Sequence, residues 1–156
     1  DARAIVASFV KAGFSRFSIS DPDDRRGQEF IKDMERFYFT SRFQFVSRNM
    51  ITQLPSVHSV AVNTLAPGRD EGVTGELFYF NFLKPGGLWL DFPFCANAGL
   101  AAEAVAVGAR VEPGYRVAAW TDREWARDVL GVDLDSEALV KRYEAVAPAV
   151  GSIPQA

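Results

Sequence analysis

The stretch ELFYFNFLKPGGLWLDF, residues 76–92, decides the fold that the sequence predicts. Aromatic and large apolar side chains, which favour strands, fill residues 76–83 and 88–92. Between these two runs lies Pro85-Gly86-Gly87, a combination typical of a tight turn. A short turn between consecutive strands implies antiparallel pairing. We therefore predict a hairpin across this stretch.

The residues on either side extend the hairpin into a sheet. Residues 57–65 have the composition of a strand and precede the turn-rich segment 67–72, which predicts a three-stranded meander over about residues 57–94. Tyr115–Trp120 is predicted to be a further strand. The expected fold class is α+β, with an antiparallel sheet of four to five strands packed against N-terminal and C-terminal helices.

Local capping and periodicity signals predict the helices. Apolar residues recur at helical spacing in several segments, with Asp, Ser or Thr before them and Gly or Pro after them. Thr121-Asp122-Arg123-Glu124 matches a capping box and is expected to open a helix that Gly131 stops. The other predicted helices are 2–12 (followed by Gly13), 25–37, 97–109 and 135–147.

Residues 37–50 have two interpretations. Phenylalanine at 37, 39, 43 and 45 follows the period of two that is typical of a strand. A continuation of the preceding helix to Met50 is the alternative. We prefer the strand because aromatic residues and Thr are enriched there.

Length and composition restrict the class of protein. With 156 residues, the chain is predicted to form a single α+β domain over residues 1–150 and a frayed tail over 151–156. A net charge of −3 argues against a nucleic-acid partner, and the chain has no apolar run long enough for a membrane span. The single Cys excludes a disulfide framework. We expect a cytoplasmic protein; a periplasmic location stays open, because a signal could have been removed.

One group of residues has a catalytic character. Cys95 precedes a predicted helix, whose N-terminus could lower the pKa of the thiol. His58 is the only histidine, and Asp91 lies four residues before Cys95. A thiolate, a base and an orienting carboxylate are the groups that cysteine nucleophilic chemistry requires. The alternative for Cys95, flanked by Phe94 and Ala96, is a small buried apolar residue.

The sequence predicts neither a metal site nor a cofactor. One His and one Cys do not make a ligand set for zinc. Asp21, Asp23 and Asp24 resemble the start of a calcium loop, but Arg25 and Arg26 stand where ligands belong. Capping of the following helix explains these carboxylates better.

The remaining signal is the aromatic content, with thirteen Phe, four Tyr and three Trp. We predict a small, non-catalytic binding domain that uses an aromatic-rich sheet surface to bind a protein partner or a second copy of itself. The alternatives are a ligand-sensing domain with an apolar pocket and a cysteine-dependent hydrolase or transferase. The predicted binding residues are Phe78, Phe80, Phe82, Trp89, Trp120 and Trp125.

Overall fold

The computed structural model describes residues 2–64, 80–92 and 98–147. It divides the chain into two compact units, residues 1–54 (unit 1) and 55–156 (unit 2). Two such units can belong to one domain, so the single α+β domain stays a prediction. The predicted C-terminal tail lies outside the described residues.

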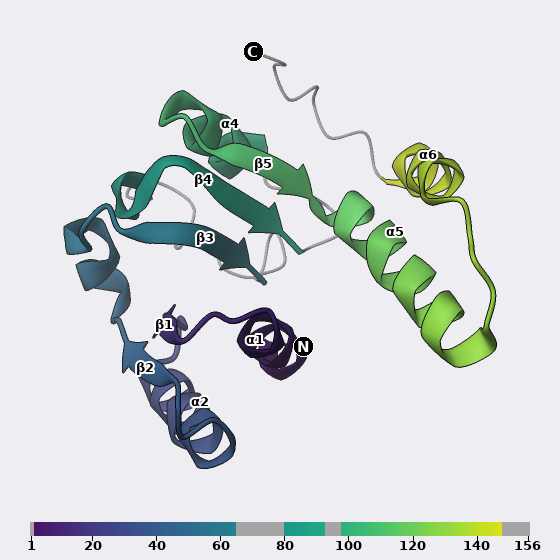
Figure 1. The fold of residues 1–156 in the computed structure, drawn as a ribbon. Coiled ribbons are helices and arrows are strands. Elements are labelled where there is room, and N and C mark those ends of the chain that lie inside the picture. The colour runs from purple at the N-terminus through teal and green to yellow at the C-terminus, as the bar shows by residue number, and fades with distance from the viewer. Residues whose placement is uncertain (1, 65–79, 93–97, 148–156) are drawn as a thin grey trace. The chain divides into compact units, whose positions relative to one another are not determined.

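Unit 1 is built around two parallel strands that pair with each other, and the helix α2 connects them along the chain (Figure 1). Strand β1 runs beside β2, and α2 packs against β2. The Asp23 carboxylate accepts hydrogen bonds from the backbone amides of Arg25 and Arg26, which begins α2 as predicted. The elements of unit 1 are α1 (Ala2–Lys11), β1 (Arg16–Ile19), α2 (Asp24–Phe37), β2 (Arg42–Phe45) and the 3-10 helix η1 (Arg48–Gln53).

Gly27 allows α2 to approach β2 closely. A Cβ at this position would lie 2.4 Å from Phe45 Cε2 and 3.1 Å from Asp21 Cβ. Gly27→Ala is therefore expected to lower the free energy of unfolding by roughly 1–2 kcal/mol, because overpacking outweighs the gain in helix propensity of about 1 kcal/mol. Urea denaturation followed by circular dichroism measures the change. The control is Gln28→Ala on the exposed side of α2. A more stable Gly27→Ala variant would show that Phe45 moves aside without cost.

Unit 2 contains a parallel sheet with the strand order β3-β4-β5. Helix α4 connects β4 to β5 and packs against both (Figure 1). The elements are β3 (His58–Asn63), the 3-10 helix η2 (Phe80–Phe82), β4 (Leu83–Asp91), α4 (Ala98–Ala106), β5 (Arg110–Pro113), α5 (Gly114–Trp125), the π-helical turn η3 (Ala126–Leu130) and α6 (Ser136–Val146).

The buried core of unit 2 includes residues of the sheet and of α4. Trp89, on the central strand, is only 2% exposed, and its neighbours across the sheet are Ala61 and Val111. Small residues on α4, among them Ala101 and Ala104, are fully buried and let the helix lie close to the strands.

The predicted antiparallel sheet of four to five strands, with its meander over residues 57–94, is wrong. The chain forms two small sheets of two and three strands, and all of their pairs are parallel. Pro85-Gly86-Gly87 is no hairpin turn but lies within β4. Residues 84–87 stand opposite Ser59 alone, between the His58–Leu83 and Val60–Leu88 pairs, so they form a bulge. Gly86 has a φ of +73°, which explains the glycine there.

The predicted strand Tyr115–Trp120 is also wrong, because these residues form the first half of α5. The expected capping box does not begin a helix. Thr121 lies inside α5, where its hydroxyl donates to the Val117 carbonyl at 2.9 Å. The helix instead begins directly after Pro113, at the end of β5.

Other local predictions are confirmed. The helices expected at residues 2–12, 97–109 and 135–147 correspond to α1, α4 and α6, within the part of the chain that is described. Residues 37–50 contain a strand, but only from Arg42 to Phe45. Phe37 instead ends α2. No helix in the described ranges is long and apolar enough to span a membrane.

Candidate functional site

The structure divides the predicted binding residues into buried and exposed groups. Phe82 and Trp89 belong to the core of unit 2. Trp120 and Trp125, both on α5, are exposed. Phe78 and the side chain of Phe80 lie outside what the structure describes. A buried side chain cannot form a contact surface, so Trp120 and Trp125 are the exposed ones among the predicted binding residues whose side chains the structure describes.

The structure does not bring His58 and Asp91 together. His58 is the first residue of β3 and pairs with the first residue of β4, whereas Asp91 is the last residue of β4. Since the strands are parallel, the two side chains lie at opposite ends of the sheet, roughly 16 Å apart along β3 at 3.3 Å per residue. His58 Nδ1 lies 3.2 Å from the Phe82 carbonyl oxygen. Asp91 therefore cannot orient His58, and Cys95 lies outside the described residues.

Asp91 joins two strands at the carboxyl end of the sheet. Its side chain is fully buried, with 0% exposure. Asn63, the last residue of β3, donates from Nδ2 to Asp91 Oδ1 at 2.8 Å, and the Phe92 amide donates to the Asn63 carbonyl at 2.9 Å. A buried carboxylate needs such donors to offset its lost hydration. The pair therefore holds β3 and β4 in register. No local pattern marks Asn63 for this role, because its partner follows 28 residues later.

An exposed apolar surface lies where α5 continues into η3. Trp125 is 55% exposed, Val129 61% and Leu130 58%. Trp125 is the last residue of α5, and Val129 and Leu130 end the π-helical turn that follows it, so three exposed large apolar side chains lie within about one turn. Val132 is also exposed, and its amide bonds back to the Ala126 carbonyl at 3.1 Å. We call Trp125, Val129, Leu130 and Val132 the Trp125 patch.

The sequence predicts Trp125 as a binding residue, but not its aliphatic neighbours Val129, Leu130 and Val132. Val129 and Leu130 precede Gly131, which ends η3 with a φ of +67°. Two large apolar residues directly before a predicted helix stop are the signal in the sequence that could have identified them. Ala126, in the same turn, is buried.

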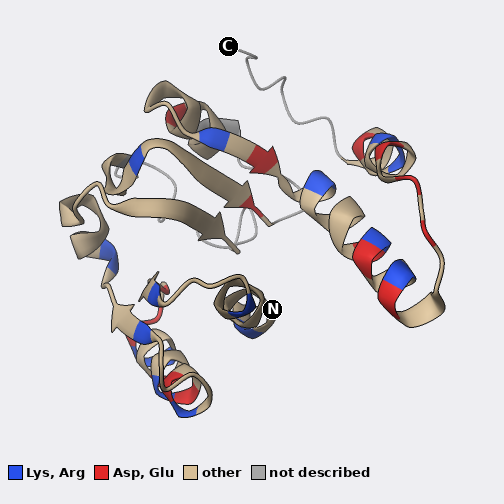
Figure 2. Ribbon diagram, in the orientation of Figure 1, with Lys and Arg blue, Asp and Glu red and all other residues tan. Residues whose placement is uncertain are grey.

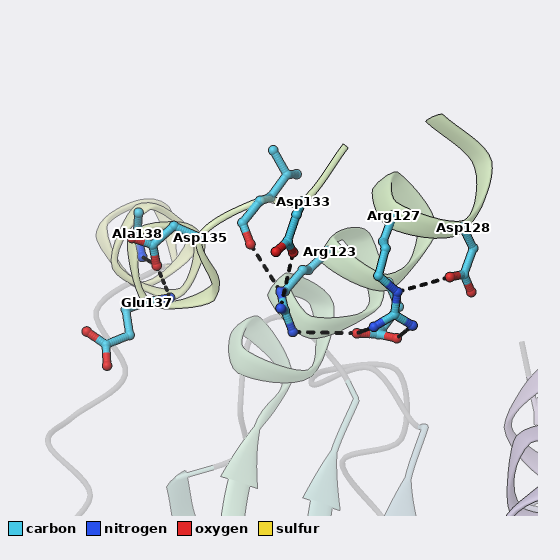
Figure 3. A network of polar contacts seen from close by, with 9 residues as sticks. Arg123, Arg127, Asp128, Asp133, Asp135, Glu137 and Ala138 are labelled. Carbon is cyan, nitrogen blue, oxygen red and sulfur yellow. Dashed lines mark hydrogen bonds and ion pairs between the residues drawn. The ribbon is translucent and has the colours of Figure 1, made fainter. Parts of the chain in front are cut away.

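Charged side chains beside the patch neutralise one another (Figure 3). Arg123 donates to the Leu134 carbonyl at 3.1 Å and to Asp133 at 3.2 Å, which ties α5 to the segment after Gly131. Arg127 pairs with Glu124 and with Asp128. Figure 2 shows acidic and basic residues interspersed along α5. Exposed ion pairs add little stability, so their consequence here is a balanced charge around the patch.

Two tyrosines connect α5 to α6. The Tyr115 hydroxyl donates to Glu144 at 3.3 Å, and the Tyr143 hydroxyl donates to Asp122. Burial and then the Glu144 carboxylate raise the pKa of Tyr115 above its ordinary value. The hydrogen bond to Asp122 raises the pKa of Tyr143. Both phenols therefore stay protonated at neutral pH and hold α6 beside α5, where no residue of α6 is fully buried.

In the described part of the chain, no group of three or more His, Cys, Asp or Glu side chains is placed to hold a metal ion. Comparisons of this chain with protein-family models, with curated proteins and with solved structures found no match.

Proposed function

We propose that this chain is a non-catalytic protein-binding domain that associates with a second copy of itself through the Trp125 patch. The observation that carries the proposal is the exposure of Trp125, Val129 and Leu130, which lie close together where α5 continues into η3. Tryptophan is enriched in protein interfaces, and large apolar side chains gathered on one surface are typical of contact sites. The proposed surface thus lies on α5 and η3 rather than on the sheet.

Charge supports a second copy as the partner. The whole chain carries −3, but residues 114–130, which form α5 and η3, contain three Arg and three Asp or Glu. Two copies can therefore approach each other along this segment without net repulsion. Arg123 and Arg127 already have acidic partners within their own chain, so the surface does not need a partner of opposite charge.

A two-fold contact would use the patch twice. In an isologous dimer, Trp125 of each copy would cover the aliphatic residues Val129 and Leu130 of the other. Trp120 lies outside this core of the contact, with the Arg116 guanidinium 5.9 Å from the centre of its ring. Such an interface has an apolar centre and a rim of charged side chains, as protein interfaces commonly do.

Trp125→Ala is expected to weaken the dimer about 30-fold, because a central Trp at an interface contributes about 2 kcal/mol or more. Sedimentation equilibrium on the full chain, from about 1 µM to 1 mM, measures the monomer–dimer constant. The control is Phe39→Ala, which removes an aromatic side chain that is 88% exposed in unit 1. It should leave the constant unchanged.

Two results would contradict the proposal. A monomer over the whole concentration range would exclude self-association. An equal loss in the Trp125→Ala and Phe39→Ala variants would place the contact elsewhere.

A further inference from the structure

Unit 1 holds two arginines side by side on the exposed face of its small sheet. In the β1–β2 register, Arg16 is opposite Arg42 and Ser18 is opposite Gln44. All four side chains lie on the exposed face, because strand residues alternate between faces. Figure 2 shows a basic residue on each of the two strands.

The opposite face of the sheet fixes this register. Phe17 and Phe43 are paired across the strands, and their rings stack at 5.0 Å with an angle of 14° between their planes. Ile19 and Phe45 form the next pair. A shift by one residue would expose these apolar side chains, so the packing of one face forces Arg16 and Arg42 together on the other.

The two arginines repel each other. Neighbouring strands lie about 4.8 Å apart, and like charges directly opposite each other destabilise a sheet. Among the residues that the structure describes, neither Arg16 nor Arg42 forms an ion pair. Four other arginines of unit 1 do, namely Arg3 with Asp33, Arg25 with Glu29, Arg26 with Asp21 and Arg36 with Asp33.

We propose that this face of the β1–β2 sheet binds the phosphate group of a small molecule between Arg16 and Arg42. Two guanidinium groups supply paired N–H donors that match the oxygens of a phosphate, and its double negative charge removes their repulsion. Ser18 and Gln44, two residues further along each strand, place a hydroxyl and an amide on the same face.

The charge distribution agrees with this site. Residues 1–54 contain nine basic and seven acidic side chains, a net charge of +2, whereas residues 55–156 contain eight basic and thirteen acidic ones, a net charge of −5. An anion is thus attracted to unit 1. The proposal is independent of the Trp125 patch, which belongs to unit 2.

The test is a titration of the full chain with inorganic phosphate, followed by the nitrogen and proton chemical shifts of the backbone amides and of the arginine Nε groups. Chloride at the same ionic strength is the reference. Saturable shifts are expected at Arg16, Arg42 and their neighbours on β1 and β2. Arg42→Gln should weaken binding at least about tenfold, because it removes charged hydrogen bonds, and Arg42→Lys should weaken it less. Arg16→Gln should match Arg42→Gln.

Arg25→Gln is the control, since it removes the same charge from an exposed arginine of unit 1 that pairs with Glu29. It should change the affinity by less than about twofold, because this exposed charge is screened by salt and lies on α2 rather than on either strand. The proposal is overturned if phosphate causes only the shifts that chloride causes. It is also overturned if Arg25→Gln weakens binding as much as Arg42→Gln, because binding would then follow net charge alone. Unchanged circular dichroism spectra of the variants exclude unfolding as the cause.

Discussion

Replacing Trp89 by Ala is expected to lower the stability of unit 2 by about 3–5 kcal/mol, the loss typical of a buried Trp or Phe. Trp89 lies on the central strand β4, where it is nearly inaccessible to solvent, and strands β3 and β5 flank it. Its removal leaves a cavity that the paired strands cannot close, because their hydrogen bonds hold them in place. Hydrogen exchange of the β3, β4 and β5 amides in native buffer measures the loss in unit 2 itself.

The matched control is Trp125→Ala. It removes the same side chain from an exposed position, so the stability of the isolated chain should change by about 0.5 kcal/mol or less. A similar small loss for Trp89→Ala would mean that the sheet does not pack around this residue. The pair of variants also separates stability from association, since only Trp125→Ala is expected to weaken the dimer.

Replacing Asp91 by Ala should cost about 2–3 kcal/mol, because it removes a buried hydrogen-bond acceptor and leaves the Asn63 amide without the partner it now has. Asp91→Asn keeps the shape and an acceptor oxygen, so its loss should be smaller. Urea denaturation and exchange of the β3 and β4 amides measure both changes. Asp133→Ala is the control, because this carboxylate is exposed and pairs with Arg123 at the surface.

A double-mutant cycle with Asn63→Ala tests whether the two side chains act as a pair. If they do, the losses from Asp91→Ala and Asn63→Ala will be clearly less than additive. Additive losses would show that each residue is held by other contacts. If Asp91→Ala lowers the free energy of unfolding no more than Asp133→Ala does, the burial of Asp91 is not important for stability.

The position of Asp91 also bears on the cysteine hypothesis. Its carboxylate is buried and bonded to Asn63 at one end of the sheet, and His58 stands at the other end. The sequence placed both residues on predicted strands of one sheet, and that inference was correct for β3 and β4. The assumed strand direction was wrong, and direction decides which ends of two strands meet.

Much of the secondary structure follows from the sequence by itself, because its signals are local. The Asp23 and Asp135 side chains accept hydrogen bonds from the first amides of α2 and α6, as their positions predict. Gly13 and Gly131 have positive φ angles at the ends of their helices. These interactions join residues within one or two turns, so the sequence pattern contains all the information that they need.

Only the tertiary structure decided the direction of the strands and which aromatic residues are exposed. The Pro85-Gly86-Gly87 signal fits a turn and a bulge equally well, and the choice depends on whether β4 pairs with itself or with β3. Tyr115–Trp120 has strand-like residues, yet it follows β5 as a helix. Trp89 and Trp125 are the same residue type, but one is buried on the central strand of the sheet and the other is exposed at the end of α5. Burial and pairing depend on residues distant in the sequence, and a local pattern does not contain them.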